Sequence, residues 1–206
     1  MILMGDLLET ATRYSVGMSV YNQVLTPNEQ LEHLRRLLMP LIEAGLVLGV
    51  HGGNHEYRVK KDTNYDMLQE FCISCGIKYL LPVQRHEITA GKQKYYIQTQ
   101  HGKGSAKTLA GKMRKINNLI NINPFMDIVA YAHTHTLHVE YYVFSDKHGR
   151  QYERDALLTG GYLHYTGQYS EHCEYAPVSR GCVVVELWAS EKHREYAFLK
   201  TETFLK

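Results

Sequence analysis

The sequence has little of what membrane proteins and secreted proteins need. No apolar run in its 206 residues approaches the roughly 20 residues of a membrane-spanning helix. The first residues lack the basic start and the long apolar stretch of a secretory signal peptide. A formal net charge of +2 is too close to neutral to indicate nucleic acid binding by charge alone. We therefore expect a cytoplasmic protein that does not enter a membrane.

Cysteine is also scarce, and its positions do not suggest a site built from thiolates. The four cysteines are Cys72, Cys75, Cys173 and Cys182. Cys72 and Cys75 form a C-x-x-C, but a structural zinc site would need a second pair at matching spacing. Because this pair falls within a helical pattern, we predict reduced thiols that pack in a helix.

The pattern of apolar residues and turns predicts one α/β domain over residues 1–206. Residues 1–5 resemble a strand, and the Thr26–Glu29 capping box begins a helix that ends at Gly45. A strand over residues 46–50 follows. Such a strand–helix–strand unit favours a parallel pair of strands with polar groups at their carboxyl ends.

The rest of the chain is expected to contain two more helices and mostly strands. One helix is predicted from Asp62 or Thr63 to Gly76, and a basic helix begins at Ser105. A buried strand over 127–132 follows the basic helix. Further strands are expected at 77–81, 87–90, 94–99, 141–144, 152–158, 181–188 and 195–199.

Histidine, by contrast, is abundant, with 12 residues, and polar groups recur at the ends of predicted strands. These groups are Asp6, Asn54 with His55, His101, and His133 with His135. A carboxylate, an amide oxygen and imidazoles form a set of N and O ligands that suits Mn, Fe, Zn or Ni. On an extended H-x-H segment both side chains point the same way, so His133 and His135 are expected to approach one site.

In this order the motifs resemble those of the calcineurin-like metallophosphoesterases. That family carries D-x-H, G-D, G-N-H-[DE], a single His and G-H-x-H along the chain. The matching segments are Gly5-Asp6, Gly53-Asn54-His55-Glu56, His101 and Ala132-His133-Thr134-His135. The resemblance covers nearly the whole chain, and Gly-Asn-His-Glu is its specific motif. It implies a four-layer α-β-β-α fold, in which two mixed β-sheets pack face to face with helices outside.

Carried over residue by residue, the resemblance implies one or two divalent metal ions per chain. Asp6 would bridge two ions, and His135 would belong to the first of them. The remaining protein ligands of the second ion would be Asn54, His101 and His133. His55 would face the phosphate oxygens as a general acid or electrostatic stabiliser, oriented by Asp6 or a neighbour. Two ions about 3.5–4 Å apart would activate a bound water for in-line attack.

Two departures from the family pattern bear on that centre. The leading D-x-H motif is absent, because only five residues precede Asp6. The first site would then keep Asp6 and His135, fewer protein ligands than a tight site uses. A strand that begins at Met1 indicates an N-terminally shortened chain that lacks the first strand and helix. Ala132 replaces the usual Gly, which requires only that residue 132 avoid a left-handed conformation.

Other histidines offer alternatives for the missing pair. His51 lies within strand spacing and is expected to be a core or edge residue. His164 follows Gly160-Gly161 in a glycine-led loop and is a candidate for contact with substrate or metal. His138 adds to an H-x-H pattern like that of metallo-β-lactamase-type hydrolases. Because Leu137 stands where that pattern needs Asp, we reject this interpretation.

The basic residues that follow His101 have two interpretations. They are Lys103, Lys107, Lys112, Arg114 and Lys115. A solvated helix face is the plainer one, and a contact surface for a phosphate backbone is the other. Lys103 is a candidate for substrate contact. Arg58 would either hold a substrate phosphate through its planar guanidinium or form a surface salt bridge.

The leading hypothesis is a metal-dependent phosphoesterase that hydrolyses a phosphomonoester or phosphodiester, with nucleic acid among the candidate substrates. The alternative is a catalytically impaired relative that binds one metal ion or a phosphorylated partner without turnover. The missing D-x-H motivates this alternative. A purely structural or nucleic-acid-binding module rests on the basic helix alone. An exposed sheet edge at the start of the chain would invite pairing with another chain.

Overall fold

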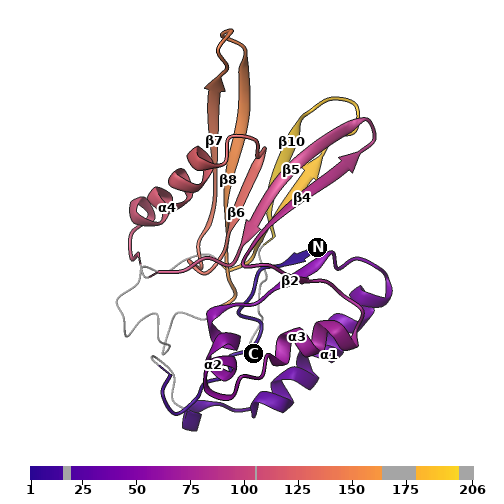
Figure 1. The fold of residues 1–206 in the computed structure, drawn as a ribbon, viewed down its shortest axis with the longest axis vertical. Coiled ribbons are helices and arrows are strands. Elements are labelled where there is room, and N and C mark those ends of the chain that lie inside the picture. The colour runs from indigo at the N-terminus through magenta and orange to yellow at the C-terminus, as the bar shows by residue number, and fades with distance from the viewer. Residues whose placement is uncertain (16–19, 105, 164–179, 200–206) are drawn as a thin grey trace. The chain divides into compact units, whose positions relative to one another are not determined.

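The computed structural model of the chain describes residues 1–15, 20–104, 106–163 and 180–199 (Figure 1). The chain divides into two compact units, Met1–Pro82 and Val83–Lys206, each with its own sheet. Both units combine helices and strands, so the predicted α/β class is confirmed. The face-to-face packing of two sheets within one domain stays a prediction.

The first unit is a small parallel sheet with helices. Its strand order is β1-β2-β3, with strands at Ile2–Leu3, Gly49–His51 and Tyr79–Leu80. Its helices are η1 Val20–Asn22, α1 Pro27–Glu43, α2 Asn54–Thr63 and α3 Met67–Ser74. The parallel pairing of β1 with β2 confirms the predicted strand–helix–strand unit, although both strands are shorter than expected.

The predicted capping box starts α1. The backbone N–H of Thr26 donates to Glu29 Oε2 at 2.8 Å, and Glu29 N–H donates back to Thr26 Oγ1 at 3.4 Å. Helix α1 then packs Leu34 and Leu38 into the core of the unit. The buried members of this core are Leu8, Leu34, Leu38, Val50, Met67, Leu68, Phe71 and Cys72. Each fully buried aliphatic side chain contributes about 1.5–3 kcal/mol to the stability of the fold.

The cysteine pair is structural, as predicted. Cys72 is buried in α3, and this burial raises the pKa of its thiol to about 12. Cys75 follows the helix as its C-cap, and neither thiol forms a disulfide. Cys173 lies outside the described residues.

One helix boundary in this unit is wrong in the prediction. The chain is already helical from Asn54, because Gly53 is directly followed by α2. Asn64 ends α2 in a left-handed conformation, with φ of 57°. Asp66 then caps α3 by accepting the N–H of Gln69 at 3.0 Å. The expected helix start at Asp62 or Thr63 is therefore the end of one helix, shortly before the next.

The second unit is built on a five-stranded mixed sheet with the order β4-β5-β6-β8-β7. Its strands are β4 Val83–Ala90, β5 Gln93–Gln100, β6 Ile128–Tyr131, β7 Leu137–Ser145 and β8 Gln151–Thr159. Strands β5, β6 and β8 run parallel, and β4 and β7 pair antiparallel at the two edges. The predicted hairpin of β4 and β5 is confirmed.

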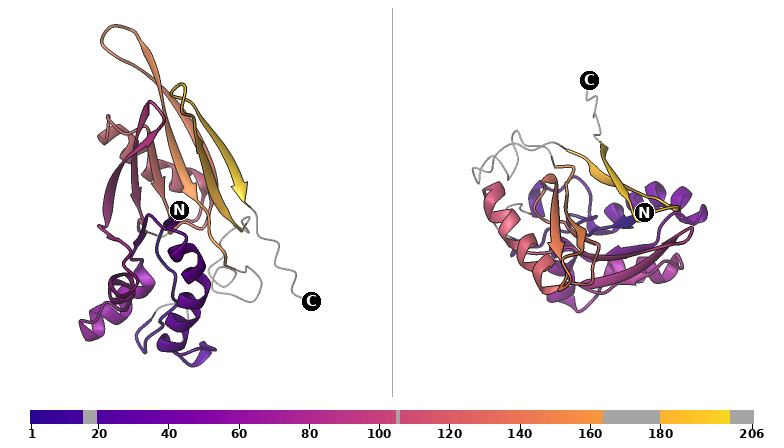
Figure 2. Two further views of the ribbon diagram at one scale, coloured as in Figure 1. Left: turned by 90° about the vertical axis from the view of Figure 1, so that its right-hand side faces the viewer. Right: turned by 90° about the horizontal axis from the view of Figure 1, so that it is seen from above.

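A second hairpin, of β9 Cys182–Leu187 and β10 Arg194–Leu199, lies beside β8 (Figure 2). A buried ion pair joins the two elements, because Arg194 Nε lies 2.6 Å from Asp155 Oδ2. Tyr196 Oη donates to the same carboxylate oxygen. Burial, followed by the hydrogen bond to Asp155, raises the pKa of Tyr196.

Helix α4, at Leu109–Ile122, packs on the five-stranded sheet. Its Ile116 and Ile120 are fully buried against residues of β6 and β8, namely Val129, Tyr131, Ala156 and Leu158. The helix begins later than predicted. Thr108 rather than Ser105 is its N-cap, and Thr108 Oγ1 accepts the N–H of Gly111 at 3.2 Å. Among the described residues, no helix is long and apolar enough to cross a membrane.

Candidate functional site

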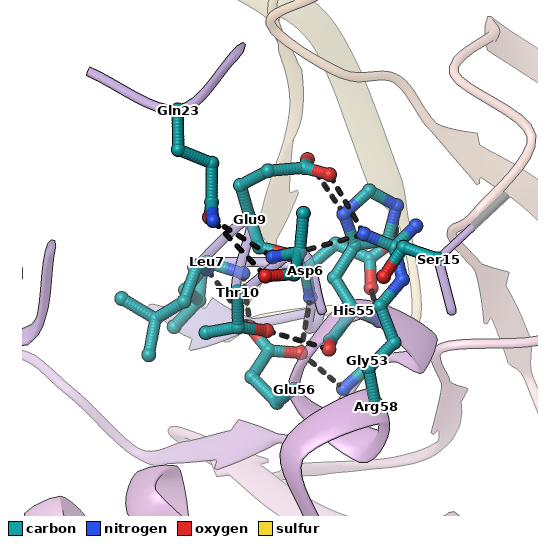
Figure 3. A network of polar contacts seen from close by, with 12 residues as sticks. Asp6, Leu7, Glu9, Thr10, Ser15, Gln23, Gly53, His55, Glu56 and Arg58 are labelled. Atoms are coloured by element: carbon teal, nitrogen blue, oxygen red, sulfur yellow. Dashed lines mark hydrogen bonds and ion pairs between the residues drawn. The ribbon is translucent and has the colours of Figure 1, made fainter. Parts of the chain in front are cut away.

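Glu56, the last residue of the Gly-Asn-His-Glu motif, is a buried carboxylate that binds backbone. Its Oε1 accepts the N–H groups of Leu7 at 2.5 Å and Leu8 at 3.0 Å. Its Oε2 accepts those of Asp6 at 3.2 Å and Gly53 at 2.9 Å (Figure 3). Burial and the Asp6 carboxylate raise the pKa of Glu56, and the backbone donors oppose this rise. Glu56 therefore fixes the segment after β1 against the start of α2.

Asp6 is held in an uncommon backbone conformation by the same contacts. Its φ of 53° lies in the left-handed region, which a residue other than glycine adopts at a cost of about 1 kcal/mol or more. Asp6 Oδ1 accepts the N–H of His55 at 3.0 Å. A Cβ added to Gly53 would lie 2.1 Å from Asp6 Oδ1 and 2.3 Å from Asp6 N. The glycine of the motif is thus required by the close approach of these two segments.

His55 is oriented by a carboxylate that the sequence analysis did not identify. Its Nδ1 lies 2.8 Å from Glu9 Oε2, and its Nε2 lies 3.8 Å from Asp6 Oδ2. Thr10 Oγ1 donates to the His55 carbonyl at 2.6 Å. Since Glu9 occupies Nδ1, the other ring nitrogen is the one available for proton transfer. The sequence feature that could have indicated Glu9 as the partner of His55 is its position three residues after Asp6.

Arg58 completes this network. Its Nη1 donates to Glu9 Oε1 at 2.7 Å and to the Glu9 carbonyl at 3.1 Å. Burial pushes the pKa of Glu9 upward, but His55 and Arg58 together outweigh burial, so the pKa of Glu9 is lowered. Of the two interpretations of Arg58, the salt bridge is present, with Glu9 as its partner, although both side chains are half-buried rather than on the surface. Contact of Arg58 with a substrate phosphate stays a prediction, as does a metal-ligand role for Asn54, the exposed first residue of α2.

In the second unit, His101 and His133 direct ring nitrogens at each other. His101 follows β5 and is only 6% exposed, and His133 follows β6. His101 Nε2 lies 3.3 Å from His133 Nδ1. His133 Nε2 lies 3.0 Å from the Gly104 carbonyl. Because a carbonyl only accepts, Nε2 carries the proton, and the lone pair of neutral His133 lies on Nδ1, toward His101.

This arrangement fits a divalent metal ion. Two imidazole nitrogens at this separation, each about 2.1 Å from one ion, would subtend roughly 100° at it, close to a tetrahedral angle. Metal-binding histidines commonly donate their other N–H to a carbonyl or carboxylate, as His133 does to Gly104. The second unit thus offers two preorganised nitrogen donors.

Two solved structures show a weak likeness to this chain. One is Vacuolar Protein Sorting 29 from Cryptosporidium parvum, with 14% identity, a TM-score of 0.35 and 97% of each chain covered. The other is wild-type Vps29 from Entamoeba histolytica in complex with Zn²⁺, with 15% identity and a TM-score of 0.28, covering 80% of this chain and 88% of that one. No protein-family model and no curated protein matches the chain.

The H-x-H segment is not extended, so its predicted conformation is wrong. His133 and His135 have φ of 63° and 49°, both left-handed, and Thr134 N–H donates to the Ala132 carbonyl at 2.7 Å. The segment is therefore a tight turn, with the two rings 6.5 Å apart. Ala132 avoids the left-handed region, as expected. A Cβ at Gly161 would lie 2.6 Å from His135 Nδ1, so this glycine leaves room for the ring.

The remaining candidates are distributed differently. His51 is fully buried in β2, as expected of a core residue. His138 Nε2 lies 3.0 Å from Glu140 Oε2 on β7. His164 lies outside the described residues. The side chain of Lys103 is exposed, and its role in substrate contact stays a prediction.

The basic residues do not form a uniformly solvated helix face. Lys112 is 7% exposed, and its Nζ donates to Thr136 Oγ1 at 2.7 Å. Burial lowers the pKa of this ammonium group. Lys115 Nζ donates to the Lys103 carbonyl at 2.6 Å. The solvated-face interpretation is wrong for Lys112, because helix packing directs this side chain inward.

Proposed function

We propose that this protein is a metal-dependent phosphoesterase. The observation that carries the proposal is the His101–His133 pair, whose facing ring nitrogens lie 3.3 Å apart. The other ring nitrogen of His133, Nε2, is hydrogen-bonded to the Gly104 carbonyl. The second support is His55, which is oriented by Glu9 within the Gly-Asn-His-Glu segment. The motif order that resembles calcineurin-like metallophosphoesterases links the two. The proposed metal ligands are Asp6, Asn54, His101, His133 and His135.

The metal would be Mn, Fe, Zn or Ni, because the proposed donors are imidazoles, a carboxylate and an amide oxygen. His101 and His133 would hold the second ion together with Asn54 and Asp6, and His135 would hold the first ion together with Asp6. When bound, the ions would supply an activated water and neutralise charge on the phosphoryl oxygens.

His55 would donate a proton to the leaving alkoxide. Its Nδ1 is engaged by Glu9, so the proton would leave from Nε2. The Glu9 carboxylate would stabilise the imidazolium before transfer, and Arg58 would keep Glu9 in place. General acid catalysis of this kind contributes about 10²–10⁴-fold to a rate.

The substrate class would be a phosphate ester in the cytoplasm, with nucleic acid among the candidates. Arg58, Lys103 and His164 are the proposed substrate contacts. A second candidate function is that the chain binds one ion or a phosphorylated partner without turnover, because the two ring nitrogens that lie close together, on His101 and His133, are donors for a single ion. Metal stoichiometry separates the two candidates, since turnover through a dinuclear centre requires two ions per chain.

The test combines metal content per folded chain with hydrolysis of bis-p-nitrophenyl phosphate in added manganese. We expect His55→Ala to lower kcat by about 10²-fold or more, and Asn54→Ala to lower both metal content and rate. His138→Ala removes a histidine that pairs with Glu140 and is the matched control. Hydrolysis that persists unchanged in both His55→Ala and Asn54→Ala would contradict the proposal. One bound ion without turnover would favour the second candidate.

A further inference from the structure

Helix α4 reaches both loops that carry the histidine pair. Lys112 and Lys115 lie three residues apart, so both project from one face of the helix. Lys112 donates to Thr136 Oγ1 at 2.7 Å, at the end of the turn that contains His133. Lys115 donates to the Lys103 carbonyl at 2.6 Å, in the loop that follows His101. One helix thus fixes the two segments from which the donors come.

The first contact places a buried charge against a hydroxyl group. Lys112 is 7% exposed, and no carboxylate among the described residues is ion-paired with it. Burying an ammonium group without a counter-ion costs free energy, so core stability alone does not explain a lysine here. Thr136 Oγ1 in turn donates a hydrogen bond to the Thr134 carbonyl at 3.1 Å, so Lys112 is linked through Thr136 to the backbone of the turn. Lys112 therefore holds the tight turn between the two left-handed histidines.

The second contact fixes the carbonyl that orients His133. The Lys103 carbonyl accepts from both Lys115 Nζ and Tyr131 Oη, the latter at 2.8 Å. A Cβ at Gly104 would lie 1.8 Å from Lys115 Nζ, so the lysine passes directly over this glycine. The Gly104 carbonyl then accepts a hydrogen bond from His133 Nε2, with 3.0 Å between nitrogen and oxygen. Displacing Lys115 would free the loop that sets the tautomer of His133.

We propose that Lys112 and Lys115 are positioning residues that hold the His101 and His133 rings in a metal-ready arrangement from helix α4. Neither lysine would touch metal or substrate. Partners that orient metal ligands typically change metal affinity about 10–100-fold when they are removed. The expected change in metal affinity rests on the proposed function, whereas the role of the lysines in placing the two rings does not.

The test uses the full chain with Lys112→Met, Lys115→Met and Thr136→Val. Arg114→Met is the matched control, because it removes a positive charge from an exposed position of the same helix. Co²⁺ affinity is measured by titration of the visible absorption band. We expect an affinity about tenfold weaker for each of the three variants, and within about twofold of wild type for Arg114→Met. Lys112→Met and Thr136→Val break the same contact, so their double variant should be no weaker than either single variant.

A second readout needs no metal. Ring ¹⁵N spectra of the metal-free protein near pH 8, where unperturbed imidazoles are neutral, report the His133 tautomer. We expect the Nε2–H form in the wild type and a mixture of tautomers in Lys115→Met. If the wild type binds no Co²⁺, the proposed function fails, and the tautomer spectra still decide whether the lysines position the ring.

A purely structural role for the lysines has a distinct outcome. A lower Tm with unchanged Co²⁺ affinity and unchanged tautomer in both lysine variants would overturn the proposal. If Lys112→Met does not fold, Thr136→Val removes the same hydrogen bond and leaves the lysine side chain in place. Full affinity in a folded Thr136→Val would equally overturn the role of Lys112.

Discussion

In the first unit a buried acid gathers backbone donors, whereas in the second unit two lysines bind a hydroxyl group and a carbonyl. Glu56 accepts four N–H groups from the segments around Asp6 and Gly53. Lys112 and Lys115 donate to the loops around His133 and His101. Glu56 is itself a residue of the Gly-Asn-His-Glu motif that it stabilises. Lys112 and Lys115, by contrast, lie on helix α4, outside the two histidine loops that they contact. The first kind of support is visible in a sequence motif and the second is not.

The largest effect is expected from removing the acid. Glu56→Ala would leave four N–H groups without their acceptor, so we expect the free energy of unfolding to fall by about 4 kcal/mol. Urea unfolding measures this change. Glu70→Ala, at an exposed position of α3, is the control and should stay within about 0.5 kcal/mol of wild type. Equal losses in the two variants would mean that Glu56 does not organise the first unit.

Substitution of two glycines tests whether the surroundings of Asp6 are more rigid than those of His135. Gly53→Ala would drive its Cβ into the Asp6 backbone nitrogen, at 2.3 Å, so we expect a loss of about 3 kcal/mol. Gly161→Ala would meet His135 Nδ1 at 2.6 Å, and a side chain can rotate away, so about 1 kcal/mol is expected. Thermal unfolding of the two variants gives the ranking. A larger loss for Gly161→Ala would show that the His135 ring is as constrained as the Asp6 backbone.

Glu9→Gln tests the orientation of His55. The amide keeps the size of the side chain but loses the charge that stabilises an imidazolium, so we expect kcat to fall about tenfold with KM little changed. The glutamine should also alter the acid stability of the fold. The lowered pKa of Glu9 gives a contribution that is fully present above its ordinary value of 4.5 and is lost as the pH falls through the folded-state pKa. Stability measured from pH 6 downward should therefore decline less steeply in Glu9→Gln than in wild type.

An effect as small as that of Gly161→Ala is expected at Tyr131. Tyr131→Phe removes a hydroxyl group that accepts from the Lys103 N–H and donates to the Lys103 carbonyl, each at 2.8 Å. We expect a loss of about 1 kcal/mol, because Lys115 still holds the same carbonyl. The double variant with Lys115→Met should lose more than the sum of the two single variants, which a double-mutant cycle in urea measures.

The sequence predicts much of the local structure and less of what supports the candidate groups. The capping box at Thr26, the parallel strand pair and the β4–β5 hairpin depend on neighbouring residues or on apolar periodicity, and all three are confirmed. The predicted extended conformation of the H-x-H segment was wrong, because the segment is a turn that distant contacts support, from Lys112 to Thr136 and from His133 to Gly104. Such contacts join residues more than 20 positions apart, and no local pattern encodes them.

The histidine partner shows the same division. Gly-Asn-His-Glu marks His55 as a candidate, yet its carboxylate partner is Glu9, 46 positions earlier. The pairing arises because Glu56 fixes the segment after β1, which brings Glu9 to the ring. Glu56, the carboxylate of the motif, thus determines which carboxylate lies beside the histidine of the motif.

The four amides bound by Glu56 have a kinetic consequence. Their hydrogens lie on chain segments separated by 45 or more positions, yet all four are held by one side chain. We expect each of these hydrogens to exchange with solvent deuterium only when its hydrogen bond to the Glu56 carboxylate breaks. All four should therefore exchange in a single opening event. The amides of Asp6, Leu7, Leu8 and Gly53 would then share one opening free energy, as a cooperative unit that is contiguous in space and divided in sequence.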